Sequence, residues 1–400
     1  MLLLVILGHD PMQHLNVLVV GAGIGGLTSA LCLARKGHSV KILEQSDFGE
    51  SGAGIQLSPN CSRVLHHLGL EAGLSAIGCQ PEAVEIREWK SAELIASTPL
   101  GILRQQTGFP YYHVGRDDLI RLLLQKVTEE PLIELRRNTR VIKFVQCSKV
   151  VCVSADGIEI FGDVLLGADG IHSKIKQLLI GEKKPRFTGN YAWRATLPAD
   201  KLPPELITPV ARLWWGPKKH FVHYPIKRRA YVNCVGIVEK HKWGKEGWME
   251  RGEHKEFLKD FENWHEDITT LIEHTNPSAC YKWALFDRYP LASWSVGRVA
   301  LLGDACHPTL PFLAQGAAMA VEDAAIIADC LERCEEIEVG LKLYESLRKK
   351  RTTRIQFLSR QNATIFHMSG LLARLRNKLV PMILGDNMNW IYKYDPLSAE

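Results

Sequence analysis

The first clear pattern along the chain is a short apolar run that ends in glycines and leads into a helical repeat. The run covers residues 17–20, and apolar side chains then recur at helical spacing over residues 27–34. Gly37 predicts the end of the helix, and residues 40–43 predict a second buried strand that closes on Glu44. The start of the chain is therefore predicted to form a βαβ unit.

Elements of the same buried type return further along the chain. Helical spacing of apolar residues predicts helices, and continuous apolar runs predict strands. The expected elements are helices over 117–128 and 316–331 and strands over 141–145, 150–153, 164–166 and 299–302. Because these segments lie far apart, the Rossmann-like domain that they predict is discontinuous.

The segment between residues 191 and 238 has a different pattern, with alternating apolar and polar positions and frequent aromatic side chains. We expect strands over 192–197, 212–215, 221–224 and 231–235. This pattern predicts a separate antiparallel sheet. Beyond it, residues 341–366 predict an amphipathic helix, and residues 390–392 predict an apolar tail that packs back onto the body.

Composition and charge narrow the class of protein. The 400 residues are 46% hydrophobic and 23% charged, with a formal net charge of +5, which is typical of an ordinary folded protein. The densest basic run, residues 227–229, is too short to predict nucleic-acid binding. The ten cysteines form no CxxC pair and no zinc-like spacing with histidines, so we expect free thiols, a reducing compartment and no metal site.

The sequence predicts no clear membrane span. Residues 1–8 are apolar, but they lack a basic flank and fall short of the roughly 20 residues that a span requires. We interpret them as an extension ahead of the first strand, with a weak membrane contact as the alternative. We expect a soluble, cytoplasmic protein.

The glycines after the first strand carry the first functional signal. Gly21, Gly23 and Gly26 form a GxGxxG pattern between a predicted strand and a predicted helix. They permit a tight turn, close approach of a pyrophosphate and close helix–strand packing. Glu44 is placed to accept hydrogen bonds from a ribose diol, and its charge would repel a 2′-phosphate. The pattern predicts FAD or NAD, and a glycine-rich turn that binds nothing is the alternative.

A second anchor lies about three quarters of the way along the chain. The strand over 299–302 delivers Asp304 at its carboxyl end, where open α/β sheets place their ligands. A proline-fixed loop then leads into small residues at Gly316 and Ala317, which admit a planar ring and begin a helix that can stabilise a reduced flavin. These features favour FAD, and an ordinary loop followed by an alanine-rich helix is the alternative.

Five motifs occur in an order that resembles the group A flavoprotein monooxygenases, over nearly the whole chain. They are the GxGxxG with Glu44, the segments 52–60, 115–119 and 167–170, and Gly303-Asp304 with His307-Pro308. Within that family the chain looks closest to the salicylate hydroxylase-like branch, on residues 191–194, 220–225 and 314–317.

The resemblance implies one FAD per chain and a cycle in which NADPH or NADH reduces the flavin. Dioxygen would then form a C4a-hydroperoxide that hydroxylates a small aromatic substrate. The resemblance places Glu44 on the adenosine ribose, Asp304 on the ribityl chain and Ala317 beside the isoalloxazine. It also implies that Ala53 or Gly54 contacts FAD.

Two charged residues are added by the resemblance. Arg116 would contact FAD, and its guanidinium suits a phosphate because it can form paired hydrogen bonds. Asp169 falls in a family motif that supports both the FAD pyrophosphate region and the use of NAD(P)H.

The predicted fold class is α/β (α+β), a discontinuous Rossmann-type FAD-binding domain with an inserted antiparallel-sheet substrate domain and a C-terminal helical tail. The expected boundaries are 14–83, 108–187 and 287–340 for the FAD-binding domain, 84–107 and 188–286 for the substrate domain, and 341–400 for the helical segment.

Three residues are candidates for the substrate side. A ring hydroxyl reacts faster when deprotonated, so the pocket should offer a base or a proton relay. His220 and Tyr224 point to the same face of a predicted strand, toward a common cavity or a common core, whereas His223 points to the opposite face. Arg194 can hold a carboxylate or position the flavin, with a surface salt bridge as the alternative. Some relatives place a polar residue at the position of Pro311, which leaves the substrate open.

The expected partner is a small aromatic molecule, and the protein is expected to be a monomer or a homodimer. Two other functions stay open. One is an FAD-dependent oxidase that produces hydrogen peroxide, and the other is a non-catalytic nucleotide-binding protein. The choice between NADH and NADPH also stays open.

Overall fold

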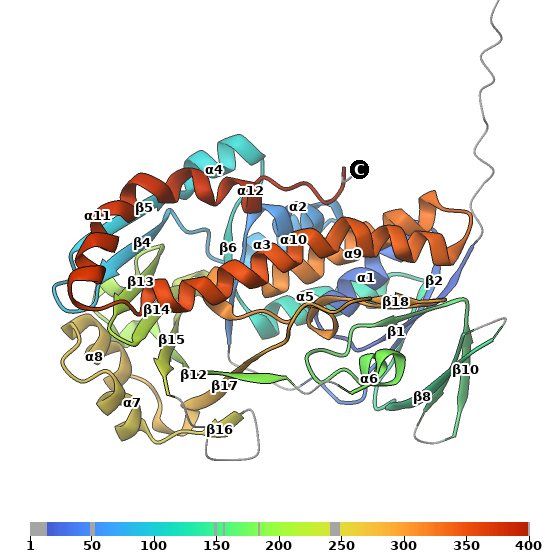
Figure 1. The fold of residues 1–400 in the computed structure, drawn as a ribbon, viewed down its shortest axis with the longest axis horizontal. Helices are drawn as coiled ribbons and strands as arrows, with labels where there is room; N and C mark the ends of the chain where they lie inside the picture. Colours follow the sequence, from blue (N-terminus) through green and yellow to red (C-terminus); the bar gives the residue numbers. More distant parts are fainter. Residues whose placement is uncertain are drawn as a thin grey trace, which may run out of the picture.

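The computed structural model describes residues 14–48, 53–147, 150–154, 157–182, 185–240 and 249–398. The apolar segment 1–8 lies outside the described residues, as does Gly52 of the segment 52–60. Two large sheets organise the molecule, and helices from both ends of the chain cover them (Figure 1).

The first sheet has six strands in the order β18-β19-β11-β1-β2-β7. Its strands are β1 (Asn16–Val20), β2 (Ser39–Leu43), β7 (Ile133–Arg136), β11 (Val164–Gly167), β18 (Ser295–Val296) and β19 (Val299–Leu301). All neighbours pair in parallel except β18 and β19. Strands from the beginning, middle and last third of the chain thus lie side by side, which confirms the predicted discontinuity.

Helices pack on this sheet through the apolar faces that the sequence predicts. In α1 (Ile24–Arg35), every residue from Gly26 to Ala34 is buried, so the helix is enclosed on all sides. It packs against both α5 (Arg116–Glu129) and α9 (Gly316–Arg333). The long α10 (Ile337–Phe366) packs in turn on α9 and runs across the molecule in Figure 1.

The second sheet has eight strands in the order β16-β17-β12-β15-β14-β13-β4-β5. They are β4 (Ala83–Glu88), β5 (Leu94–Pro99), β12 (Arg186–Pro198), β13 (Val210–Gly216), β14 (Lys219–Ile226), β15 (Tyr231–Glu239), β16 (Met249–Arg251) and β17 (Tyr281–Asp287). The expectation of a purely antiparallel sheet is wrong at one place, because β13 and β4 pair in parallel. β4 comes from a much earlier part of the chain, so no tight turn joins the two strands and their direction is not constrained.

The two faces of the second sheet are buried by different partners. On one face, Trp193, Trp214 and Phe221 form a core with side chains of α7 (His254–Asp260) and α8 (Glu266–Glu273). On the other face, Trp215 stacks on Phe366 at the end of α10, with the ring centroids 4.7 Å apart. The second face is therefore the one that looks toward the rest of the molecule.

The C-terminal segment packs back onto the body, as the sequence predicts. It contains α11 (Gly370–Asn387) and α12 (Asn389–Tyr392), and Ile391 is fully buried. Arg63 on α2 (Pro59–His67) forms an ion pair with Asp395. None of the helices in the described ranges is long and apolar enough to cross a membrane.

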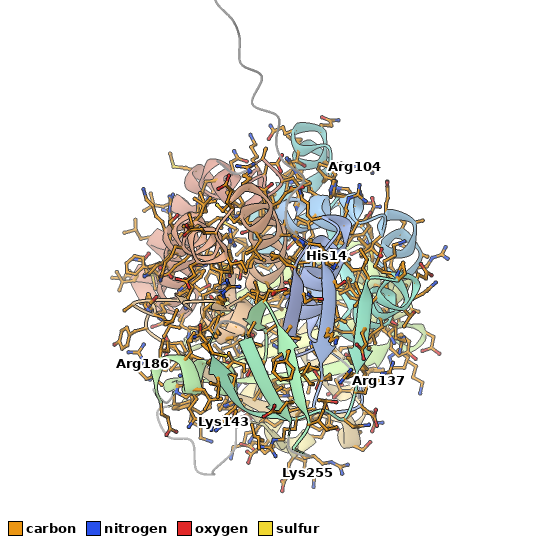
Figure 2. All side chains as sticks on the ribbon, turned by 90° about the vertical axis from the view of Figure 1, so that its right-hand side faces the viewer. His14, Arg104, Arg137, Lys143, Arg186 and Lys255 are labelled. Atoms are coloured by element: carbon orange, nitrogen blue, oxygen red, sulfur yellow. The ribbon has the colours of Figure 1, made fainter. Side chains whose placement is uncertain are left out.

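Two smaller sheets complete the fold. β3 (Gly54–Leu57) pairs with β6 (Tyr112–Gly115), and a three-stranded sheet joins β8 (Val141–Gln146), β9 (Val150–Ser154) and β10 (Glu159–Gly162). The remaining helices are α3 (Glu71–Ile77), α4 (Leu100–Thr107) and α6 (Lys174–Ile180). Figure 2 shows that labelled basic side chains such as Arg104, Lys143 and Arg186 lie well apart on the surface.

Candidate active site

The glycine turn after β1 has the geometry that a dinucleotide pyrophosphate requires. Gly21 has a φ of +101°, and a Cβ on Gly26 would lie 1.9 Å from the carbonyl oxygen of Gly21. A Cβ on Gly23, in contrast, would meet no atom within 4 Å. Gly21 and Gly26 therefore serve the local backbone packing, whereas Gly23 borders open space at the N-terminus of α1.

Glu44 lies beside this turn and is already oriented. Its carboxylate accepts hydrogen bonds from the Ala22 N–H at 2.8 Å and from the Ser46 N–H at 3.0 Å. Together with Gly23 and Arg116, it lines a cavity of about 340 Å³. The structure thus brings three of the predicted cofactor residues to one cavity.

Asp304 follows β19, in the short helix Gly303–Ala305. Its side chain is exposed, yet the surrounding protein raises the pKa of its carboxyl by burial, against the opposing charges of His307 and Arg116. Arg116 is close enough to act on Asp304 and also lines the cavity of Gly23 and Glu44, so the two distant anchors belong to one region.

Asp169 has a structural role in addition to any contact with a cofactor. Its Oδ2 accepts the backbone N–H groups of Lys174 and Ile175, at 2.7 and 3.0 Å, and so caps α6. Its Oδ1 is buried without a hydrogen bond among the described residues. A Cβ on Gly21 would lie 3.0 Å from the Asp169 Cα, which places Asp169 against the glycine turn.

Ala53 and Gly54 join the cofactor region to the second sheet. The Arg116 N–H donates to the Ala53 carbonyl at 2.8 Å, and the Gly54 N–H donates to Asn233 Oδ1 on β15 at 2.7 Å. A Cβ on Gly54 would lie 2.6 Å from the Asn233 side chain. Gly54 is therefore required for packing against the second sheet.

Gly316 and Ala317 begin α9 and are both half-buried. Gln315 precedes them and is fixed by hydrogen bonds to Ser58 at 2.9 Å and Asn60 at 3.1 Å. The first N–H groups of a helix have no acceptor within the helix, so this end of α9 offers donors for an anion. Small residues at this point keep the donors accessible.

His220 and Tyr224 lie on the same face of β14, and His223 lies on the other. His220 packs against Phe312 and Phe366, whereas His223 stacks on Trp214 in the core beneath α7 and α8. This alternation confirms the predicted orientation of the three side chains. The His220 side of β14 faces toward α10.

Tyr224 is surrounded by polar groups from the cofactor region. Its ring lies 4.5 Å from that of His113, and Gln56, which accepts a hydrogen bond from the Tyr111 hydroxyl, is close enough to act on its phenol. Burial raises the pKa of the Tyr224 phenol, and Arg194 opposes this shift. Tyr224 is thus a neutral phenol near a positive charge.

Arg194 is a half-buried cation that forms no ion pair within the described part of the chain. The salt bridge considered as an alternative is not formed with any residue of these described ranges. Its guanidinium lies over Trp283, 4.9 Å from the ring centroid, and its Nε is buried without a hydrogen bond. Burial lowers the pKa of Arg194, and Tyr224 and Arg116 are the charged or titratable groups that act on it. A half-buried guanidinium without an ion pair among the described residues favours an anionic ligand on this face.

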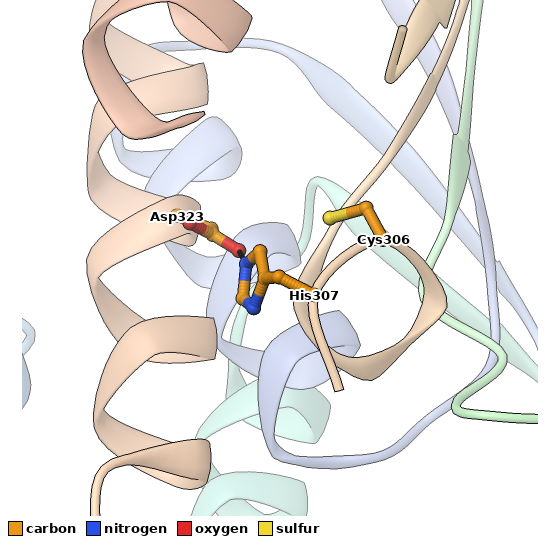
Figure 3. A group of neighbouring side chains, drawn as sticks. All are labelled: Cys306, His307 and Asp323. Carbon is orange, nitrogen blue, oxygen red and sulfur yellow. Dashed lines mark hydrogen bonds and ion pairs between the residues drawn. The ribbon is translucent and has the colours of Figure 1, made fainter. Parts of the chain in front are cut away.

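Several polar residues of the region were missed by the sequence interpretation. His113, Asn233 and His367 lie outside the motifs, and their positions depend on strand register or on the end of α10. A further missed feature is the buried pair of His307 and Asp323, in which Nε2 and Oδ2 lie 2.5 Å apart (Figure 3).

Cys306 lies beside this pair, so a cysteine, a histidine and an aspartate face one another. Asp323 already accepts bonds from the Gly303 N–H and from Arg348. The pair therefore fixes the loop that carries Asp304 against α9, and we assign it a structural role.

Comparison with known proteins gives the family. A model described as "FAD binding domain" matches residues 14–360. A 3-amino-4-hydroxybenzoate 2-monooxygenase of Streptomyces platensis is 36% identical over 393 residues, covering 97% of this chain and 98% of the relative. A 3-hydroxybenzoate 6-hydroxylase of Aquipseudomonas alcaligenes is 37% identical, covering 95% and 98%. This chain belongs to the FAD-dependent aromatic monooxygenases.

A solved structure supports the same assignment. A salicylate hydroxylase in complex with its substrate superposes with a TM-score of 0.80 at 26% identity, and the match covers 96% of each chain. The residues present here fit FAD, because open space borders Gly23, Glu44 is already oriented, and the Asp304 side chain is exposed. As a member of this family, the protein is an FAD-dependent oxidoreductase with NAD(P)H as electron donor.

Proposed function

We propose that this monooxygenase hydroxylates a small aromatic acid that carries a ring hydroxyl. The observation that carries the proposal is Arg194, a half-buried cation without an ion-pair partner in the described ranges, beside the face of His220 and Tyr224. The two relatives named above act on benzoates with a ring hydroxyl, so both substrates combine a carboxylate with a phenol.

The protein groups would divide the work between binding and proton transfer. Arg194 would pair with the substrate carboxylate, which compensates its charge. His220 would accept the proton of the ring hydroxyl, and Tyr224 would fix the ring by a hydrogen bond. When bound, FAD supplies the activated oxygen. Enclosure by Phe312 and Phe366 would exclude water from His220.

We propose that the remaining predicted residues hold FAD. Glu44 would bind the adenosine ribose, the turn at Gly23 the pyrophosphate and Asp304 the ribityl chain. Arg116 lies between these anchors and would neutralise phosphate charge. The donors at Gly316 and Ala317 would face the flavin ring.

The first experiment is a substrate screen on the purified yellow protein. Hydroxybenzoates, 3-amino-4-hydroxybenzoate and 6-hydroxynicotinate are added one at a time, and NADH or NADPH oxidation is followed together with product. We expect at least one compound to accelerate oxidation with product formed in step. If hydrogen peroxide accounted for all oxygen consumed with every compound, the protein would be an oxidase.

The second experiment is Arg194→Gln. Loss of a charge-assisted hydrogen bond costs about 1.5–3 kcal/mol, so KM for a carboxylated substrate should rise about ten- to a hundredfold. Binding of the matching phenol without a carboxylate should change little. Arg186→Gln is the control, since Arg186 starts the same strand and pairs with Asp287. Equal effects on both ligands would reject the carboxylate role.

A further inference from the structure

The ring of His220 contacts a second imidazole that comes from the end of α10. His220 Nδ1 lies 2.8 Å from His367 Nε2, and the two rings are tilted by 41°. His220 is 1% exposed and His367 9%. None of the described residues forms a hydrogen bond with His220 Nε2, so that nitrogen is left for a ligand.

The other nitrogen of His367 faces a carboxylate at the surface. His367 Nδ1 lies 3.8 Å from Oε2 of Glu239, the last residue of β15, whose side chain is 31% exposed. This distance is longer than a hydrogen bond, and one bridging water or a small rotation would close it. The exposed fraction of the side chain thus increases from His220 to His367 and again to Glu239.

We infer that His367 and Glu239 form a proton relay between His220 and solvent. The inference rests on the proposed function, because it starts from His220 as the group that accepts the substrate proton. Phe312, Phe366 and Trp215 enclose His220, so a proton taken up there has no direct route to water. His367 and Glu239, which follow His220 toward the surface, supply such a route.

Each step moves one proton. The ring hydroxyl gives its proton to His220 Nε2, and the N–H at His220 Nδ1 passes to His367 Nε2. The N–H at His367 Nδ1 then passes through water to Glu239 and leaves to solvent. Both imidazoles remain neutral with exchanged tautomers. Reprotonation of the product in the reverse direction restores the starting tautomers, so the cycle is balanced.

The surroundings keep both rings neutral, which a relay of this kind requires. Burial, and then His367, lowers the pKa of His220 well below its usual value. Burial and the nearby Arg376 lower the pKa of His367 to about 4. Arg376 is itself held by the carbonyl groups of Ile365 and Phe366. Glu239 is the carboxylate that faces His367 within this group.

The test measures proton release when a phenol binds to the FAD-loaded enzyme. 3-Hydroxybenzoate is mixed in a stopped-flow instrument with wild type, His367→Gln or Glu239→Gln, and phenolate absorbance and a pH indicator are recorded. His367→Gln keeps a hydrogen-bond acceptor for His220 but cannot pass a proton. We expect release to slow at least tenfold in His367→Gln and less in Glu239→Gln, with an unchanged dissociation constant.

Two further variants separate a relay from a packing role. In His367→Ala, imidazole added to the buffer should restore fast proton release, because it can occupy the space of the lost ring. Glu71→Gln is the matched control, since Glu71 faces His66 at 3.9 Å away from this site, and it should release protons at the wild-type rate. Wild-type release in His367→Gln, or failure of imidazole to accelerate His367→Ala, would overturn the relay.

The same data separate the relay from the proposed function. Proton release on binding requires no hydroxylation, so the relay is decided even if no hydroxylated product forms. If 3-hydroxybenzoate does not bind to the wild type, ¹⁵N spectra of the histidines decide instead. A shared proton between His220 and His367 that disappears in His367→Gln supports the relay, and two independent rings overturn it.

Discussion

Gly23 and Gly26 belong to the same motif, but their surroundings differ. We expect Gly26→Ala to destabilise the protein by about 3 kcal/mol, because the new Cβ would meet the Gly21 carbonyl at 1.9 Å. Gly23→Ala should leave the stability of the FAD-free protein unchanged but weaken FAD binding at least tenfold, since its Cβ would project into the open space. Urea unfolding and FAD titration measure the two effects. Equal losses of stability would contradict this division of roles.

The sequence predicts the positions of some site residues but not of others. His220 and Tyr224 could be placed on one face because a strand alternates with a period of two residues. His367 could not be found, because its contact with His220 depends on where a 30-residue helix ends against a distant sheet. The resemblance implied that Ala53 or Gly54 contacts FAD. The structure adds a packing reason for glycine at position 54, because a Cβ there would lie 2.6 Å from the Asn233 side chain of the second sheet.

At the scale of elements, α9 and α10 are joined by buried charges as well as by apolar packing. Arg348 on α10 lies between Glu322 and Asp323 of α9, at 2.6 and 2.7 Å, and all three side chains are fully buried. Arg351 adds hydrogen bonds to Glu322 and to the Trp390 carbonyl of the C-terminal segment. This cluster holds the loop of Asp304, α9, α10 and the tail in one arrangement.

The charged cluster predicts a loss of stability in acid. Burial alone would raise the pKa of Asp323, but the charges of His307 and Arg348 outweigh burial and lower it to about 2. Because the unfolded value is about 3.9, the stabilisation is complete above that pH and is lost as the pH falls toward 2. Its size is on the order of 2 kcal/mol.

Urea unfolding at a series of pH values tests this expectation. Asp323→Asn should flatten the dependence of stability on pH between about 4 and 2. Asp329→Asn is the control, since Asp329 pairs with Arg333 on the outer side of the same helix. Arg348→Met should cost about 3–5 kcal/mol at neutral pH, because it removes the guanidinium that two buried carboxylates share and leaves Glu322 with Arg351 and Asp323 with His307. A loss below 1 kcal/mol would mean that the cluster contributes little.

Most helices and strands could be predicted from the sequence, but the pairing of some strands could not. Helices such as α9 and α10 carry a long apolar period, so the predicted ranges 316–331 and 341–366 agree closely with the structure. The parallel pairing of β13 with β4 was not predictable, because it joins segments that are distant in the chain. Local periodicity gives the element, whereas the partner of a strand depends on the whole fold.

At the scale of the whole molecule, the proposed FAD site touches elements from every part of the chain. Ligand at a hundred times its dissociation constant adds about 2.7 kcal/mol to stability, so FAD should raise Tm by several degrees. Asp304→Ala should abolish most of this rise and release the flavin. Asp200→Ala, at an exposed carboxylate of the short helix Ala199–Lys201, should keep it. An Asp304→Ala protein that stays yellow with an unchanged Tm would remove Asp304 from the site.

The strand order of the six-stranded sheet also limits when the protein can mature. β11 lies between β1 and β19, and β19 ends only at Leu301. The six strands can therefore pair fully only after about three quarters of the chain has been synthesised. The glycine turn, although synthesised first, must wait for Asp304 and α9. If these residues hold FAD as proposed, FAD would bind only late in synthesis, and until then the early βαβ unit would expose an unpaired strand edge that favours aggregation.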